Sequence, residues 1–169
     1  MIRRRDWSVA ALAAVACAAA PRGWAAPAPV RVSLPAQTRL LTGEVLAAEA
    51  WAGQGLLVVF WATHCPFCQR HNAKLHQLVT ALGAQAPRVL AVSSDRDPAV
   101  VQRYLKTHGY PFWVTLEAAA WQAALGVRRV LPTTVPINRQ GQRGLVMPGE
   151  MFEEDLAELA RWTQATPTG

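Results

Sequence analysis

Two cysteines three positions apart, Cys65 and Cys68, are the residues of this sequence best suited to chemistry. They follow an unbroken apolar run, Leu56–Phe60, and precede a helical pattern over Gln69–Leu82. An apolar run of this length is typical of a strand that is buried on both faces. Cys65 is then expected at a helix N-terminus, where free N–H groups and the helix dipole favour a negative charge. The sequence therefore predicts that Cys65 is a thiolate nucleophile.

Cys68 lies one helical turn further on, close enough to resolve a mixed disulfide formed at Cys65. Pro66 suits the first turn of the helix, because its missing N–H would have no partner there. The same pair could instead bind zinc together with His64 and His71, or form an inert disulfide. However, His64 directly flanks Cys65, so one helical turn cannot easily direct four ligands to one metal. We favour redox chemistry over zinc, and zinc over a structural disulfide.

Composition narrows the function class further. The chain has 169 residues and a net charge of +6, enough residues for one domain with a substantial core. The first 25 residues hold four of the 17 basic and one of the 11 acidic residues, so the remainder carries only +3. That charge is too small and too scattered to indicate nucleic-acid binding.

The N-terminus has the pattern of an export signal. Three arginines at positions 3–5 precede an apolar stretch over Val9–Ala20, which is too short to span a membrane. Small residues before the expected site predict cleavage after Ala25. Two variants stay open: the arginines loosely resemble a twin-arginine signal, and Cys17 lies in a poor lipobox where it could be lipidated. We expect a signal peptide over 1–25, a linker over 26–39 and one domain over 40–164. The protein is then exported to the periplasm or cell envelope.

Cleavage would leave two cysteines, both in the CxxC pair. An oxidising compartment allows such a pair to form a disulfide. We therefore expect a redox-active Cys65–Cys68 disulfide, with no metal and no other cofactor.

The remaining elements alternate between strands and helices. The patterns predict strands at Arg88–Ser93, Thr133–Ile137 and Arg143–Met147, an extended segment at Phe112–Leu116, and helices at Asp97–Thr107, Ala118–Leu125 and Glu150–Trp162. Strands separated by helices, then a hairpin and a final helix, predict an α/β fold with a central mixed β-sheet flanked by helices.

Three segments, in this order, carry a family resemblance: FWATHCPFC, VLAVSSD and GVRRVLPTTVPINRQG. With these segments the chain resembles the thioredoxin superfamily, and more specifically the exported thiol–disulfide oxidoreductases of the TlpA/ResA type. The resemblance extends over about Leu40 to Trp162 and implies a thioredoxin fold.

The resemblance implies that Pro132 is cis and lies beside the CxxC pair. A turn of this kind presents the backbone of Leu131 to an incoming peptide as a strand partner. We expect Trp61, Phe67 and His64 to contact the substrate as well. The family further implies a monomer that reduces protein disulfides and whose own disulfide is reduced again by a membrane thiol reductase. It also implies a role in cytochrome c maturation or oxidase assembly. The second hypothesis, from another class, is a metal-binding chaperone that uses Cys65, Cys68 and a histidine.

The sequence departs from the family pattern at four positions. Val59 stands where thioredoxins carry a buried acid, and His71 where TlpA-type proteins often carry glutamate. His71 is then a candidate base for Cys68, or else a solvated helix residue. His64 replaces a tryptophan and either stabilises the Cys65 thiolate or is an exposed turn residue. Pro136 removes a donor from its strand, so we expect that strand to be irregular or at an edge there.

Overall fold

The computed structural model describes residues 29–165. Its centre is a seven-stranded mixed sheet in the order β1-β8-β7-β4-β5-β6, with β9 also paired to β7, and a separate hairpin joins β2 to β3. The signal peptide and its cleavage site lie outside the described residues. The strands are β1 (Val30–Arg31), β2 (Gln37–Arg39), β3 (Val45–Ala47), β4 (Leu56–Trp61), β5 (Arg88–Ser93), β6 (Trp113–Thr115), β7 (Thr133–Ile137), β8 (Gln142–Arg143) and β9 (Met147–Pro148). The helices are α1 (Pro66–Leu82), α2 (Pro98–His108), α3 (Ala118–Leu125) and α4 (Glu153–Gln164), with short 3₁₀ turns η1 (Ala48–Trp51) and η2 (Gly83–Gln85).

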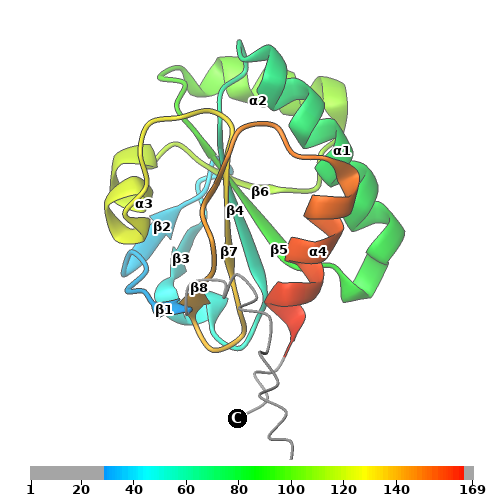
Figure 1. Cartoon of the computed structure of the whole chain (residues 1–169). Coiled ribbons are helices and arrows are strands. Elements are labelled where there is room, and N and C mark those ends of the chain that lie inside the picture. The colour runs from blue at the N-terminus through cyan, green and yellow to red at the C-terminus, as the bar shows by residue number, and fades with distance from the viewer. Residues whose placement is uncertain (1–28, 166–169) are drawn as a thin grey trace, which may run out of the picture.

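Strand β4 organises the sheet. All six of its residues are buried, and it pairs in parallel with β5 and antiparallel with β7. Side chains alternate across a strand, so Leu57, Val59 and Trp61 face one layer and Leu56, Val58 and Phe60 the other. The first layer packs against α1, α2 and α4, and the second against α3. Figure 1 shows α3 on one side of the sheet and α1 and α4 on the other, which confirms the predicted architecture.

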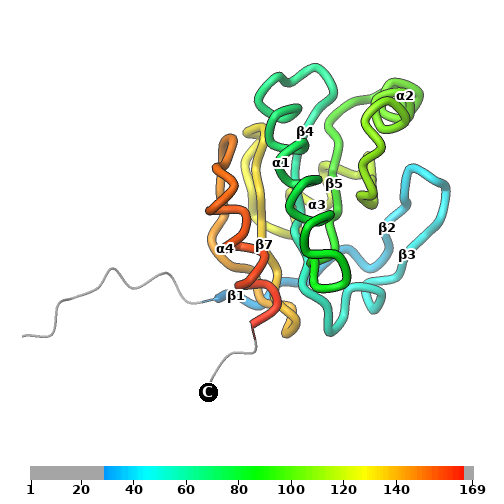
Figure 2. The backbone as a smooth tube through the Cα atoms, turned by 90° about the vertical axis from the view of Figure 1, so that its right-hand side faces the viewer, coloured from blue at the N-terminus to red at the C-terminus, as the bar shows by residue number. Residues whose placement is uncertain are grey.

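Helices α1 and α4 lie side by side over the same face of the sheet (Figure 2). Helix α4 begins at Glu153, three residues later than expected, because the chain before it does not follow a helical path. Gly149 has φ +100°, a left-handed value that favours glycine, and Phe152 is extended. Among residues 29–165, no helix is long and apolar enough to cross a membrane.

The ordered domain begins earlier than the predicted boundary at residue 40. Within the segment 26–39, expected to be a linker, β1 pairs with β8 and β2 pairs with β3. Thr38 in β2 is fully buried. A proline-rich composition indicates extended backbone, but it does not distinguish a free linker from an edge strand that finds a partner.

Strand β7 is neither an edge strand nor irregular against β4, so the expectation for Pro136 is wrong for β7 itself, and the interruption falls on the strands beside it. Pro136 lies opposite Leu57 of β4 in a continuous ladder. On the other side of β7 the partner strand is interrupted: β8 ends at Arg143, and β9 resumes at Met147. The predicted return strand over 143–147 is therefore two short strands, because proline offers no N–H to a continuous partner.

Candidate active site

Both cysteines lie where β4 has ended and α1 begins. Cys65 is the N-cap residue of α1, and Pro66 is its first helical residue. The Sγ atom of Cys65 accepts a hydrogen bond of 3.2 Å from the backbone N–H of Cys68. The two cysteines form a disulfide, with their Cα atoms 5.2 Å apart. In the dithiol form, the same N–H and the helix N-terminus would favour negative charge on Cys65.

The two sulfurs differ in accessibility. Cys65 is partly exposed, whereas Cys68 is fully buried against the core beneath α1. A large substrate can therefore reach only the sulfur of Cys65. This asymmetry matches the assignment of Cys65 as the attacking residue and Cys68 as the resolving one.

Asp95 holds the turn that leads into the cysteines. Its carboxylate accepts hydrogen bonds from the Thr63 N–H at 2.9 Å, the Thr63 hydroxyl at 2.8 Å and the Ser93 hydroxyl at 2.7 Å. The His64 Nδ1 atom lies 3.6 Å from the same group. Burial alone would raise the pKa of Asp95, but the hydrogen bonds from Ser93 and Thr63 outweigh it and hold that pKa below its usual value. Asp95 thus presents a carboxylate to the backbone of the active-site turn.

The peptide bond between Leu131 and Pro132 is cis, as predicted. The Pro132 carbonyl accepts a hydrogen bond of 2.7 Å from the N–H of Gly149. The Thr133 hydroxyl donates to the Val130 carbonyl at 2.8 Å. These two bonds fix the loop on both sides of the proline.

His71 is fully buried, so the expectation of a solvated helix residue is wrong. Its Nδ1 atom accepts a hydrogen bond of 3.3 Å from the Met151 N–H, and its Nε2 atom lies 2.9 Å from the Thr134 hydroxyl. Desolvation lowers the pKa of His71 to about 4, with the nearby Glu150 only partly opposing it. The imidazole is therefore neutral at pH 7, with Nδ1 as acceptor and the proton on Nε2. In this arrangement both nitrogens are occupied, and the ring connects α1 to β7 and to the chain before α4.

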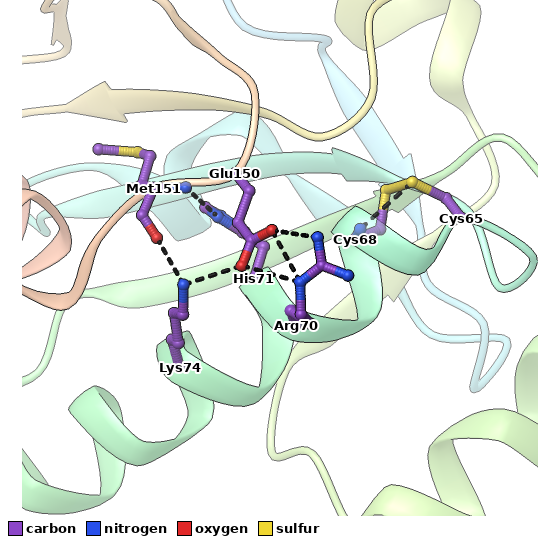
Figure 3. A network of polar contacts seen from close by, with 7 residues as sticks. All are labelled: Cys65, Cys68, Arg70, His71, Lys74, Glu150 and Met151. Atoms are coloured by element: carbon purple, nitrogen blue, oxygen red, sulfur yellow. Dashed lines mark hydrogen bonds and ion pairs between the residues drawn. A yellow bond between two sulfur atoms is a disulfide. The ribbon is translucent and has the colours of Figure 1, made fainter.

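A charged network surrounds Glu150 beside this histidine (Figure 3). Arg70 donates through Nε to both carboxylate oxygens, at 2.9 and 3.2 Å, and its Nη2 lies 2.7 Å from Oε2. Lys74 donates to Glu150 at 2.8 Å and to the Met151 carbonyl at 3.2 Å. The hydrogen bonds from Arg70, followed by those from Lys74, lower the pKa of Glu150 to about 2. Glu150 is therefore ionised throughout the neutral range.

A cavity of about 500 Å³ opens beside the cis-proline, and we call it the groove. The groove extends from Phe67, which stands between the two cysteines, past the proline loop to the Glu150 network. A peptide chain bound at Cys65 would therefore lie along it. Two of its walls are exposed aromatic rings, Phe67 at 56% and Phe152 at 72% exposure. The groove is lined by Phe67, Lys74, Leu131, Pro132, Gly149, Glu150, Met151 and Phe152.

The structure separates the residues predicted to contact substrate. Phe67 and Leu131 line the groove, and the His64 side chain is 81% exposed next to Cys65. Trp61 is fully buried with its ring 5.1 Å from that of Tyr104, so the expected contact between Trp61 and a substrate is wrong. Trp61 supports the site from the core instead.

Two carboxylates of the site were not identified from the sequence. Asp95 could have been, because β4 and β5 are parallel, so the residues following both strands meet at the same edge of the sheet. Glu150 carries no such signal, since the residues before a helix have no fixed position relative to α1. Within residues 29–165, no three side chains of the histidine, cysteine, aspartate and glutamate types gather where they could hold a metal ion.

Comparisons with known proteins agree with this geometry. The sequence profile of the Redoxin family matches residues 27–142. The thiol–disulfide oxidoreductase ResA of Halalkalibacterium halodurans is 30% identical over 120 residues, which cover 70% of this chain and 68% of that protein.

Solved structures show the same fold. A putative thioredoxin from Neisseria meningitidis has a TM-score of 0.69 and 28% identity, over 79% of this chain and 90% of that one. A thiol:disulfide interchange protein of the thioredoxin family from Chlorobium tepidum has a TM-score of 0.70 at 19% identity, over 82% of this chain and 97% of that one. The chain therefore belongs to the Redoxin family, has a thioredoxin-like fold, and is a thiol–disulfide oxidoreductase of the ResA type.

Proposed function

We propose that this protein is an exported disulfide reductase. The Cys65 thiolate attacks a disulfide of a substrate protein, forms a mixed disulfide and releases one substrate thiolate. Cys68 then attacks the Cys65 sulfur, closes the Cys65–Cys68 disulfide and releases the second substrate thiolate. Two electrons pass to the substrate in each cycle.

The observation that carries this proposal is the difference between the two sulfurs. Cys65 is accessible, and its sulfur accepts a hydrogen bond from the Cys68 N–H. Cys68 is buried one helical turn further along α1. Beside them, the loop at Leu131 and Pro132 offers backbone to an extended peptide. Phe67 and His64 flank the point of attack, where a substrate would contact them.

We do not assign His71 the role of base for Cys68. Both of its nitrogens have partners, and a pKa lowered to about 4 makes it a poor proton acceptor at pH 7. The proton of Cys68 can instead pass to the substrate thiolate released in the first step, which keeps the reaction balanced.

The proposal includes a compartment and partners. The N-terminal pattern supports export to the periplasm or cell envelope. The substrates are then disulfide-bonded proteins of that compartment, and a membrane thiol reductase returns Cys65 and Cys68 to the dithiol form. A role in cytochrome c maturation or oxidase assembly is proposed from the resemblance to TlpA/ResA-type proteins alone.

Cysteine variants test the assignment of roles. Cys65→Ser should abolish disulfide reduction, whereas Cys68→Ser should accumulate mixed disulfides that can be isolated and identified by mass spectrometry. Limiting alkylating reagent should label Cys65 of the reduced protein first. Labelling of Cys68 before Cys65, or mixed disulfides trapped by Cys65→Ser, would reverse the assignment.

A further inference from the structure

The short segment Gly149–Met151 connects the two halves of the site. At one end, the Gly149 N–H donates to the Pro132 carbonyl at 2.7 Å. At the other end, both backbone groups of Met151 bond to side chains of α1: its N–H donates to His71, and its carbonyl accepts from Lys74. Glu150 lies between them and is held by two cations of α1 (Figure 3). The segment therefore sets the position of the cis-proline loop relative to the cysteine helix.

The Glu150 network differs from an ordinary surface ion pair. Exposed pairs contribute little unless the geometry is bidentate or several charges form a network. Here the Glu150 side chain is only 17% exposed, Arg70 bonds to both of its oxygens, and Lys74 adds a second cation that is 26% exposed. Both exceptions apply, so the network is able to hold the segment in place.

The same two cations also support the aromatic walls of the groove. The Arg70 guanidinium lies 4.8 Å from the centre of the Phe67 ring, and the Lys74 ammonium lies 5.8 Å from that of Phe152. Cations at these distances are attracted to the face of a ring. Removing the carboxylate would release Arg70 and leave Lys74 with only its bond to the Met151 carbonyl, so both rings would lose part of their support.

We propose that Glu150 is a positioning residue that sets the width of the groove, and so governs how tightly an extended protein substrate is held beside Cys65. This inference rests on the proposed function. Glu150 acts through Arg70, Lys74 and the proline loop, and takes no part in the thiol chemistry. Its loss should therefore affect substrates that occupy the groove much more than those that need only the Cys65 sulfur.

The test compares a protein disulfide with a small one. Glu150→Gln keeps the size of the side chain and removes its charge; we expect the KM for insulin to rise about three- to tenfold with kcat nearly unchanged, as for loss of uniform binding. The efficiency with hydroxyethyl disulfide should change much less than the efficiency with insulin, and the reduction potential of the cysteine pair should stay at the wild-type value. Glu150→Asp should restore much of the affinity for insulin. Glu154→Gln makes the same charge change at an exposed position of α4 and serves as the control.

The outcomes are distinguishable. Equal losses on insulin and on hydroxyethyl disulfide, or a shifted reduction potential, would show that Glu150 acts on the cysteines and would overturn the inference alone. An unchanged KM for insulin would also overturn this inference and leave the proposed function intact. A wild-type protein that reduces neither substrate would overturn the proposed function, and the inference with it.

Discussion

At the scale of single residues, His71 shows how burial changes the chemistry of a side chain. The position three residues after Cys68 is compatible with a base. In the folded protein the ring is removed from water and bonded at both nitrogens. Desolvation disfavours the charged form, so the residue serves as a neutral connector between three elements.

This connector makes stability depend on pH in a defined direction. The pKa of His71 is about 4 in the folded protein and about 6.5 when unfolded, so the unfolded chain binds the extra proton between these values. Its contribution to stability is complete above pH 6.5 and is lost as the pH falls through 4. Over that range wild type should lose about 3 kcal/mol relative to His71→Gln, whose amide offers one acceptor and one donor group and does not titrate. Denaturant unfolding at a series of pH values measures this difference, and parallel profiles would contradict it.

The same variant separates the connector role from the base role. If His71 only connects elements, His71→Gln should release mixed disulfide at the wild-type rate at neutral pH. If His71 were the base, the rate should fall by about 10²–10⁴-fold and recover at high pH. Stopped-flow measurement with a disulfide peptide distinguishes the two results.

At the scale of elements, the position of α4 depends on a close approach to the start of β4. Gly55 directly precedes β4, and an added Cβ there would lie 2.7 Å from the Thr163 hydroxyl and 2.8 Å from the Thr163 carbonyl at the end of α4. The carbonyl belongs to the backbone and cannot turn aside as a flexible side chain would. The end of α4 can reach the sheet only because residue 55 has no side chain.

Gly55→Ala should therefore lower the free energy of unfolding by about 1–3 kcal/mol, the usual cost of overpacking. Thermal or urea unfolding measures the change. Strand β4 is six residues long and would span about 20 Å, so Gly55 lies far from the cysteines. The reduction potential should stay at the wild-type value. An unfolding midpoint equal to that of wild type would show that α4 shifts without cost.

At the scale of the whole molecule, the family, the fold, the cysteine pair and the predicted export signal all fit one thiol–disulfide oxidoreductase. The family, the fold and the disulfide between Cys65 and Cys68 are consistent with one another. The export signal predicted at residues 1–25 would supply the oxidising compartment in which that pair works. It would also remove Cys17, so that no third thiol could mispair.

We therefore expect the mature envelope protein to lack the first 25 residues and to contain two thiols after reduction. Intact-mass measurement with and without alkylation of the purified envelope protein checks both numbers. A diacylglycerol-modified N-terminus at Cys17 would instead support lipid anchoring. A cytoplasmic protein of full length would contradict export.

Short local patterns, and the order of the motifs along the chain, made the fold and the centre of the site predictable. An apolar run predicts a buried strand and a proline after Cys65 predicts a helix start, and each of these depends on a few neighbouring residues. The cis bond at Pro132 followed from the resemblance of its segment to the TlpA/ResA type. These signals were sufficient for the mixed sheet, for the redox pair and for the loop beside it. They did not identify strands β1 and β2, since extended backbone acquires a partner only in the folded sheet.

Contacts between residues far apart in the chain were decided by the tertiary structure alone. Glu150 meets Arg70 across 80 positions of sequence, and Thr63 meets Asp95 across 32. The burial of His71 likewise requires Thr134 and Met151 from other elements. Such pairings depend on how helices and strands pack, and no local pattern of residue types encodes that packing. The sequence by itself thus determined which atoms carry out the redox chemistry, while the packing of α1 against the chain before α4 decided what surrounds them.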